Sequence, residues 1–315
     1  MPGTATSTDF DDHGGRFRHE ALFYADAEQF VEGTGGFVEA ALSAGEPVMV
    51  AVLRHRAELL KARLGTSAAY VTFADMAELG RNPARIIPAW RRFVDQHGDA
   101  ASLRGIGEPI WADRSAEELT ECQRHEALVN MAFEGGRPWW LLCPYDRASL
   151  GPDVLDEARR SHRYLLTDGC SSTSDVYDGW PLPYGGQLPD PPADARCQRF
   201  DARALTSLRS LFSQWTASVL PDGRAAEMVL AAHELATNSV RHGGGGGELR
   251  FWREGTTAVA EVRDLGWLND PLAGRRVPSS EDGRGRGLWL VNQLCDLMQV
   301  RSTWQGTVVR IRISS

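Results

Sequence analysis

The residue types best suited to chemistry lie in the segment 234–242. Glu234 and Asn238 are four residues apart, and His242 follows one helical turn later. Apolar residues recur at helical spacing around them, so we predict a helix over 224–240 with a buried stripe and a separate polar face. A carboxylate and an amide oxygen on one helix face can hold a hydrated Mg²⁺, which prefers hard oxygen ligands and keeps several of its waters.

Two glycine-bearing segments fit the same chemistry. Asp264 ends an alternating strand pattern, where its carboxylate can accept a hydrogen bond from an exocyclic amine such as that of adenine, and Gly266 lets a flat base approach the backbone. Three further glycines precede the helix pattern that begins at Leu288: Gly283, Gly285 and Gly287. Glycines at a helix start expose N–H groups to phosphate. A lone Gly-x-Gly-x-Gly is more often a plain loop, so the prediction depends on the order and spacing of all three segments.

Residues 197–315 resemble the GHKL superfamily, which includes the ATP sites of gyrase, heat-shock chaperones, histidine kinases and mismatch-repair proteins, and most closely its anti-sigma-factor serine kinases. The order of helices and strands predicts an α+β sandwich with helices on one face of a mixed sheet. The resemblance implies that this is the ATP-binding (Bergerat) sandwich of that superfamily, with ATP and Mg²⁺ as cofactors.

The resemblance also implies roles for single residues. Glu234 is expected as the catalytic carboxylate, Asn238 as the Mg²⁺ ligand and Asp264 as the residue that reads adenine. The other expected nucleotide contacts are His242, Gly266, Gly283, Gly285, Arg286, Gly287, Leu288 and Thr307. In one departure from the family's Asp-x-Gly-x-Gly pattern, Gly266 is followed by Trp267 and Leu268. We expect the missing second glycine to impair closure of the loop 267–282 over the nucleotide, and therefore turnover, more than it impairs ATP binding.

The first half alternates strand and helix patterns, which predicts an α/β domain with a mainly parallel sheet and helices on both faces. The expected strands are 21–24, 47–53, 70–73, 103–111 and 139–143, and the expected helices are 27–44, 56–64, 83–97 and 117–133.

Residues 15–167 resemble the methanogen/methylotroph sensory (MEDS) domain, through Leu22-Phe-Tyr24, Gly45-Glu-Pro47, Gly80-Arg-Asn-Pro83, Gly107-Glu-Pro109 with Trp111, and Cys143-Pro-Tyr-Asp146. That resemblance implies a RecA-like small-molecule sensor. The sequence lacks a Gly-x-x-x-x-Gly-Lys-Ser/Thr phosphate loop.

The candidate sensor residues are His19, Tyr24, Trp111 and His125, together with Glu108, Cys122 and Glu126. For several of these residues, a purely structural role is a strong alternative to ligand binding. Trp111 is more often a core or pocket wall, and His125 and Glu126 more often lie on a helix surface or in a structural hydrogen bond. Cys122 and His125 are one turn apart, but two ligands alone rarely make a metal site.

Composition sets the remaining limits. We expect a disordered tail at 1–14, a sensor domain at 15–167, a linker rich in Pro, Gly, Ser and Asp at 168–196, and the ATP-binding domain at 197–315. The net charge of −8 argues against direct nucleic-acid binding. The five cysteines form no Cys-x-x-Cys pair, which argues against a disulfide framework or a zinc ribbon. The sequence shows no apolar run of membrane-span length and no signal peptide, so we expect a cytoplasmic protein.

These features predict a regulator that senses a small-molecule signal and binds Mg-ATP. By resemblance, it phosphorylates serine or threonine on an anti-sigma-factor antagonist, or holds a sigma factor. Two alternatives stay open: a non-catalytic ATP-binding switch that binds a protein partner, and a sensor histidine kinase. The histidine kinase would need a dimerisation helix hairpin with its own histidine, which the linker does not offer. A homodimer is also left open.

Overall fold

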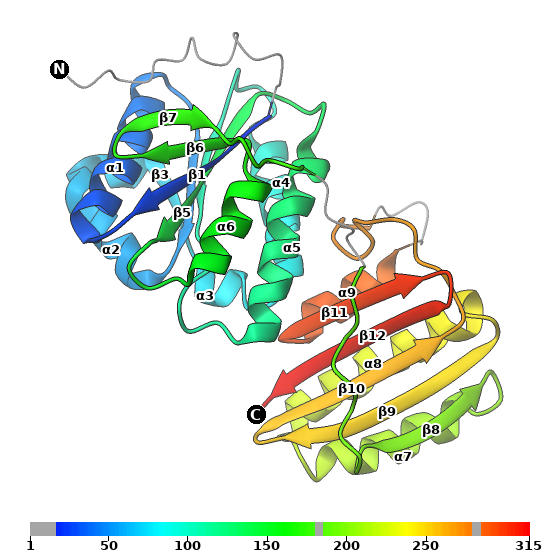
Figure 1. The fold of residues 1–315 in the computed structure, drawn as a ribbon. Coiled ribbons are helices and arrows are strands. Elements are labelled where there is room, and N and C mark those ends of the chain that lie inside the picture. Colours follow the sequence, from blue (N-terminus) through cyan, green and yellow to red (C-terminus); the bar gives the residue numbers. More distant parts are fainter. Residues whose placement is uncertain (1–16, 180–184, 279–284) are drawn as a thin grey trace. The chain divides into compact units, whose positions relative to one another are not determined.

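The computed structural model describes residues 17–179, 185–278 and 285–315 (Figure 1). The chain forms two compact units, residues 1–181 and 182–315. Each unit has its own sheet and its own hydrophobic core.

The first unit is built on a seven-stranded sheet of order β3-β2-β4-β5-β1-β6-β7. Its strands are β1 (Phe17–Tyr24), β2 (Val48–Val52), β3 (Val71–Asp75), β4 (Arg104–Gly107), β5 (Trp139–Asp146), β6 (Tyr164–Thr167) and β7 (Cys170–Thr173). Its helices are α1 (Ala27–Ser43), α2 (Arg54–Leu64), α3 (Met76–Leu79), α4 (Ile86–Gln96), α5 (Ala116–Phe133) and α6 (Pro152–Ser161). All strand pairs except β6–β7 are parallel, which confirms the predicted mainly parallel sheet.

Two neighbouring tryptophans of β5 show that helices cover both faces of this sheet. Successive strand residues point to opposite faces. Trp140 packs against Phe37 of α1, with ring centroids 5.1 Å apart. Trp139 packs on the other face against Trp90 of α4 and Phe133 of α5, at 5.7 and 4.7 Å. The prediction of helices on both faces is therefore confirmed.

The second unit has a five-stranded sheet of order β11-β12-β10-β9-β8. Its elements are β8 (Arg196–Asp201), α7 (Leu205–Ala217), α8 (Asp222–His242), β9 (Gly246–Glu254), β10 (Thr257–Asp264), α9 (Arg286–Leu294), β11 (Leu297–Thr303) and β12 (Gly306–Ser314). Every pair is antiparallel, so the predicted mixed sheet was wrong on this point. Short hairpins join β9 to β10 and β11 to β12, and hairpin connections produce antiparallel neighbours.

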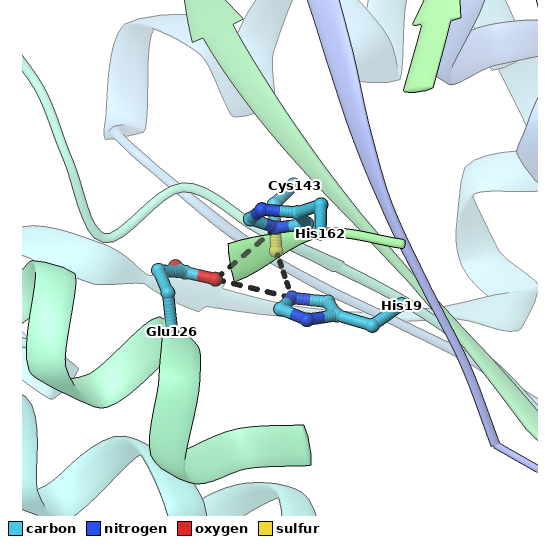
Figure 2. A group of neighbouring side chains, drawn as sticks. All are labelled: His19, Glu126, Cys143 and His162. Carbon is cyan, nitrogen blue, oxygen red and sulfur yellow. Dashed lines mark hydrogen bonds and ion pairs between the residues drawn. The ribbon is translucent and has the colours of Figure 1, made fainter. Parts of the chain in front are cut away.

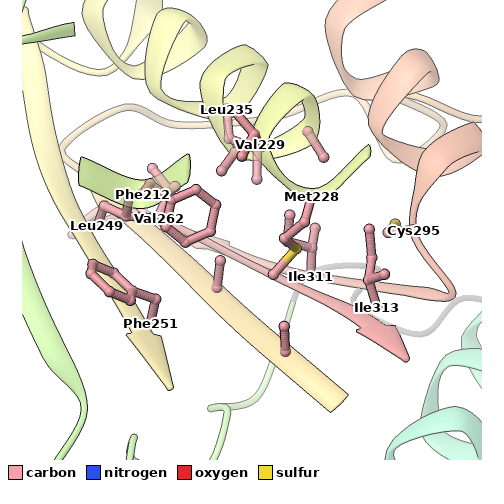
Figure 3. Packing of buried hydrophobic residues seen from close by; sticks show 14 of the residues in the cluster. Phe212, Met228, Val229, Leu235, Leu249, Phe251, Val262, Cys295, Ile311 and Ile313 are labelled. Carbon is pink, nitrogen blue, oxygen red and sulfur yellow. The ribbon is translucent and has the colours of Figure 1, made fainter. Parts of the chain in front are cut away.

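The core of this unit lies between the helices and one face of the sheet (Figure 3). Phe212 of α7 and Met228 and Leu235 of α8 contribute the helical side of the core, while Phe251 and Ile311 contribute the strand side. Burying the apolar stripe of α8 here leaves its remaining face available for the polar residues described below.

The region predicted as a linker, 168–196, is partly structured. Residues Cys170–Thr173 form β7, which pairs with β6 at the edge of the first sheet. Two aromatic residues of this region, Trp180 and Tyr184, which the sequence offers as residues that could pin the linker to a domain surface, lie outside the described residues. In the part of the chain that the structure describes, no helix is long and apolar enough to cross a membrane.

Candidate functional site

Helix α8 presents the first part of the candidate site. Its buried residues, among them Met228 and Leu235, face the core, whereas Glu234 and Asn238 are only partly buried. His242 is the last residue of the helix and is exposed. The polar face predicted from the spacing is therefore present, with Glu234 and Asn238 one turn apart on it.

The first turn of α9 lies directly against Asn238. A Cβ atom built on Gly287 would sit 2.8 Å from Asn238 Nδ2 and 3.1 Å from Asn238 Oδ1, so a larger residue would have to displace this amide. Gly285 precedes the helix as its N-cap with a left-handed φ of 77°, a conformation that glycine adopts without strain. The structure thus brings the second glycine segment onto the Asn238 face of α8.

Asp264, at the end of β10, is fixed through both carboxylate oxygens. Its Oδ2 accepts a hydrogen bond from Ser239 Oγ at 2.5 Å, and its Oδ1 accepts one from the backbone N–H of Gly266 at 2.8 Å. A Cβ atom on Gly243 would fall 2.4 Å from Asp264 Cγ, so glycine is needed for this close approach. These contacts hold the carboxylate at one position beside the end of α8.

Thr307 completes this arrangement from β12. It lies opposite Asp264 in the antiparallel register, and its hydroxyl donates to the carbonyl oxygen of Gly266 at 2.8 Å. Ser302 Oγ lies 2.7 Å from the Thr307 hydroxyl and accepts a hydrogen bond from the N–H of Leu268 at 2.8 Å. Ser302 and Ser239 were not among the predicted site residues, because a single serine belongs to no motif, although Ser239 adjoins the predicted Asn238.

The loop between β10 and α9 is described only in part. Gly283 and Arg284 lie outside the described residues. Arg286 is exposed in the first turn of α9, and Leu288 is partly buried against the core. Asn292 Nδ2 donates to the carbonyl oxygen of Gly274 at 2.9 Å, and this bond ties the described part of the loop to α9.

Comparison with protein families assigns both halves of the chain. Residues 18–163 match the MEDS family, described as the MEthanogen/methylotroph, DcmR Sensory domain. Residues 199–313 match the histidine kinase-like ATPase domain. The chain joins a MEDS domain to a histidine kinase-like ATPase domain. The segments predicted to contact the nucleotide and the contacts around Asp264 all lie in the ATPase domain.

Two solved structures give further likenesses to 38% of the chain. The RsbU and RsbW domains of Rv1364c from Mycobacterium tuberculosis align at 18% identity and a TM-score of 0.29, over 32% of that chain. The histidine kinase AdeS of Acinetobacter baumannii aligns at 15% identity and a TM-score of 0.24, over 67% of that chain. No curated protein matches the chain.

In the MEDS domain, four buried side chains from distant parts of the chain meet (Figure 2). Glu126 Oε2 lies 3.1 Å from His19 Nε2 and 3.3 Å from His162 Nε2, and His19 Nε2 lies 3.3 Å from Cys143 Sγ. His19 and Glu126 were candidates from the sequence, whereas Cys143 as a cluster member and His162 were not. No motif spacing could have revealed them, since the four residues come from β1, α5, β5 and the end of α6.

The electrostatics of this cluster reflect its burial. Burial and repulsion from His162 lower the pKa of His19 to about 4. Burial alone would raise the pKa of Glu126, but the facing imidazoles of His162 and His19, which favour the carboxylate form, outweigh it and hold that pKa below its usual range. Burial raises the pKa of the Cys143 thiol well above its usual value.

Tyr24 belongs to a different group, at the carboxyl ends of the parallel strands. Its hydroxyl donates to Glu108 Oε1 at 3.2 Å, while Glu108 Oε2 accepts from the N–H of Leu53 at 3.3 Å. Arg56 lies over the Tyr24 ring and pairs with Asp146 at 3.1 Å. Burial raises the pKa of Glu108 to about 7. Ligands of open parallel sheets bind at this edge, so Tyr24 stays a candidate sensor residue.

The remaining sensor candidates lie in neither group. The Arg114 guanidinium lies over the Trp111 ring at 3.7 Å. The Cys122 thiol donates to the carbonyl oxygen of Pro109 at 3.2 Å, and burial raises its pKa to about 12, so it remains a thiol. His125 is buried rather than on a helix surface. Among the described residues, the cluster of possible metal ligands includes neither Cys122 nor His125.

Proposed function

We propose that the ATPase domain binds Mg-ATP and transfers its γ-phosphate to a serine or threonine of an anti-sigma-factor antagonist, under control of a small molecule sensed by the MEDS domain. One set of contacts gives the main support for the nucleotide site. Asn238 lies against Gly287, while the neighbouring Ser239 bonds Asp264, which in turn bonds Gly266. Three segments that are separate in sequence thereby converge at one end of α8.

The side chains present fit this nucleotide. The amide oxygen of Asn238 is a hard ligand of the kind that Mg²⁺ prefers, and the partly buried Glu234 lies one turn away. Each oxygen of Asp264 accepts one hydrogen bond from the protein and retains a further lone pair for the amine of adenine. The bound Mg-ATP would supply the phosphoryl group.

The chain's own contribution to transfer is positioning and proton transfer. Glu234 would orient the attacking hydroxyl and accept its proton. The N–H groups of the first turn of α9, which begins next to Gly285, would stabilise the charge of the phosphates. Arg286, exposed in this first turn, is placed to contribute positive charge.

A non-catalytic switch is the second candidate. It is favoured by Leu268, which stands where the family's second glycine would be, and by the preceding Trp267, which is 71% exposed. A large aromatic residue in this loop provides a surface for a protein partner rather than a hinge. Under this alternative, the ATPase domain binds ATP and an antagonist or sigma factor without transferring phosphate.

Transfer of radiolabel from γ-labelled ATP to a purified anti-sigma-factor antagonist separates the two candidates. We expect labelling by the wild type, its loss in Glu234→Gln with nucleotide binding retained, and loss of both transfer and binding in Asn238→Ala. Tight ATP binding by the wild type with no label on any serine or threonine would contradict the kinase assignment and support the switch.

A further inference from the structure

The buried cluster of the MEDS domain brings together donor atoms of the kind that bind a cation. One atom from each of His19, Glu126, Cys143 and His162 lies within 4.8 Å of all the others, and each of the four residues is at most 3% exposed (Figure 2). Glu126 Oε1 is also buried, and no hydrogen bond reaches it from the residues that the structure describes. Buried carboxylates are normally paired or bound to a metal.

In each histidine, Nδ1 is the outer ring nitrogen, which points away from the cluster. The hydrogen-bond partner of Nδ1 shows which ring nitrogen carries the proton. Asn130 Nδ2 donates to the carbonyl oxygen of Ser161 at 2.8 Å, which fixes the side-chain oxygen of Asn130 as the atom 3.0 Å from His19 Nδ1. His162 Nδ1 lies 2.8 Å from the carbonyl oxygen of Ala158. Both outer nitrogens therefore carry the ring proton in the neutral imidazole.

The inner nitrogens consequently present lone pairs to the centre of the cluster. Both Nε2 atoms face Glu126 Oε2, which is itself an acceptor. Three acceptors that meet in a buried space repel one another unless a proton or a metal ion lies between them. Histidines that bind metals show this same pattern, in which the second ring nitrogen donates to a protein oxygen.

We propose that His19, Glu126, Cys143 and His162 bind one Zn²⁺ ion. In a tetrahedral zinc site, neighbouring nitrogen or oxygen ligands are about 3.3 Å apart, and nitrogen and sulfur ligands about 3.6 Å apart. The three contacts within the cluster, 3.1, 3.3 and 3.3 Å, are close to these edges. Two imidazoles, a carboxylate and a thiolate form a donor set that suits this borderline-soft ion.

The charge and proton balance also suits a buried site. Binding converts the Cys143 thiol to a thiolate, because a coordinated thiol loses its proton, and one proton is released to solvent. The thiolate and the Glu126 carboxylate together neutralise the two positive charges of the ion. Four protein ligands complete the coordination, so the ion would hold β1, β5, α5 and α6 together and would leave no open position for a substrate.

The competing arrangement is metal-free. A proton on one imidazole would pair with Glu126, and the Cys143 thiol would donate to the other. Chelator-stripped full-length protein titrated with Co²⁺ and then Zn²⁺ distinguishes the two. Cobalt bound to a thiolate shows a charge-transfer absorption band, and the background Cys170→Ser/Cys197→Ser removes the two exposed thiols.

We expect about one equivalent of Co²⁺ to produce the thiolate band and Zn²⁺ to displace it, with a rise in the unfolding temperature of the MEDS domain. Cys143→Ser should abolish the band, and Glu126→Gln should weaken binding by more than about a hundredfold. Asn130→Ala, which removes the partner of His19 Nδ1, should weaken it by about 10- to 100-fold. Cys122→Ser is the matched control, since it changes a buried thiol of α5 outside the cluster.

The proposal is overturned if the stripped wild type binds neither ion, or if Cys143→Ser binds them as tightly as Cys122→Ser. The wild-type cobalt spectrum tests it without any variant, so a variant that fails to fold does not decide the result.

Discussion

Asp264 is a single residue whose chemistry can be tested directly. Asp264→Asn should weaken ATP binding by about 10- to 150-fold, the loss expected for a charge-assisted hydrogen bond of about 1.5–3 kcal/mol. It should also reduce the preference for adenine over guanine, because an amide can present a donor or an acceptor whereas the carboxylate only accepts. Competition of GTP against labelled ATP measures both. Asp270→Asn, in the following loop, is the control, and unchanged selectivity in Asp264→Asn would show that this residue does not read the base.

The raised pKa of Glu108 predicts that the stability of the MEDS domain depends on pH. Burial raises its pKa from 4.5 to about 7, so the folded state keeps a proton that the unfolded chain has already lost. The free energy of unfolding should therefore be highest below about pH 4.5, fall as pH rises to about 7, and stay level above, with a total change on the order of 3 kcal/mol. Glu108→Gln removes the ionisation and should be more stable than the wild type at pH 8.

Thermal unfolding at pH 5 and pH 8 measures this difference. In the full chain, Mg-ATP should raise the unfolding temperature of the ATPase domain only, so the unshifted transition belongs to the MEDS domain. If the wild type and Glu108→Gln differ equally at both pH values, the pKa of Glu108 is not raised.

At the scale of elements, the close approach of α9 to α8 makes a prediction about glycine. In Gly287→Ala the new methyl group must displace the Asn238 amide, because its carbon would sit 2.8 Å from Nδ2. Alanine favours helix over glycine by roughly 0.5–1 kcal/mol, so we expect little loss of stability but at least about a tenfold loss of Mg-ATP affinity. Gly223→Ala in α8, where the methyl group meets nothing within 4 Å, is the matched control and should bind normally.

Elements were easier to predict than their contacts. The helical period around Leu235 and the alternation that ends at Asp264 located α8 and β10, since those patterns are local. The antiparallel pairing of β12 with β10 was missed because it depends on the path that the chain takes between two strands that are distant in sequence. The meeting of His19 with Cys143 and His162 was missed for the same reason, because the topology of the parallel sheet creates it. Ser239, by contrast, adjoins Asn238 and could have been considered as a partner of Asp264.

At the scale of the whole molecule, all segments predicted to contact the nucleotide lie in one of the two compact units. A fragment of residues 182–315 should bind Mg-ATP about as tightly as the full chain, and a fragment of residues 1–181 should not bind it. The fragment of residues 182–315 should also lose any response to the sensed molecule. Coupling between the two sites, typically ~1–3 kcal/mol, requires both domains. Saturable ATP binding by residues 1–181 would contradict this division of labour.

Calorimetric titration of Mg-ATP into the full chain and into Asn238→Ala is the most direct test of the nucleotide site. We predict saturable binding of one nucleotide per chain, dependent on Mg²⁺, by the wild type. In Asn238→Ala the Mg²⁺-dependent binding should be lost, because the amide oxygen that would bind the ion is gone, while circular dichroism shows an unchanged fold. Thr237→Ala, one residue away on the same helix, should bind as the wild type does. Equal affinity of Asn238→Ala and the wild type for Mg-ATP would contradict the site.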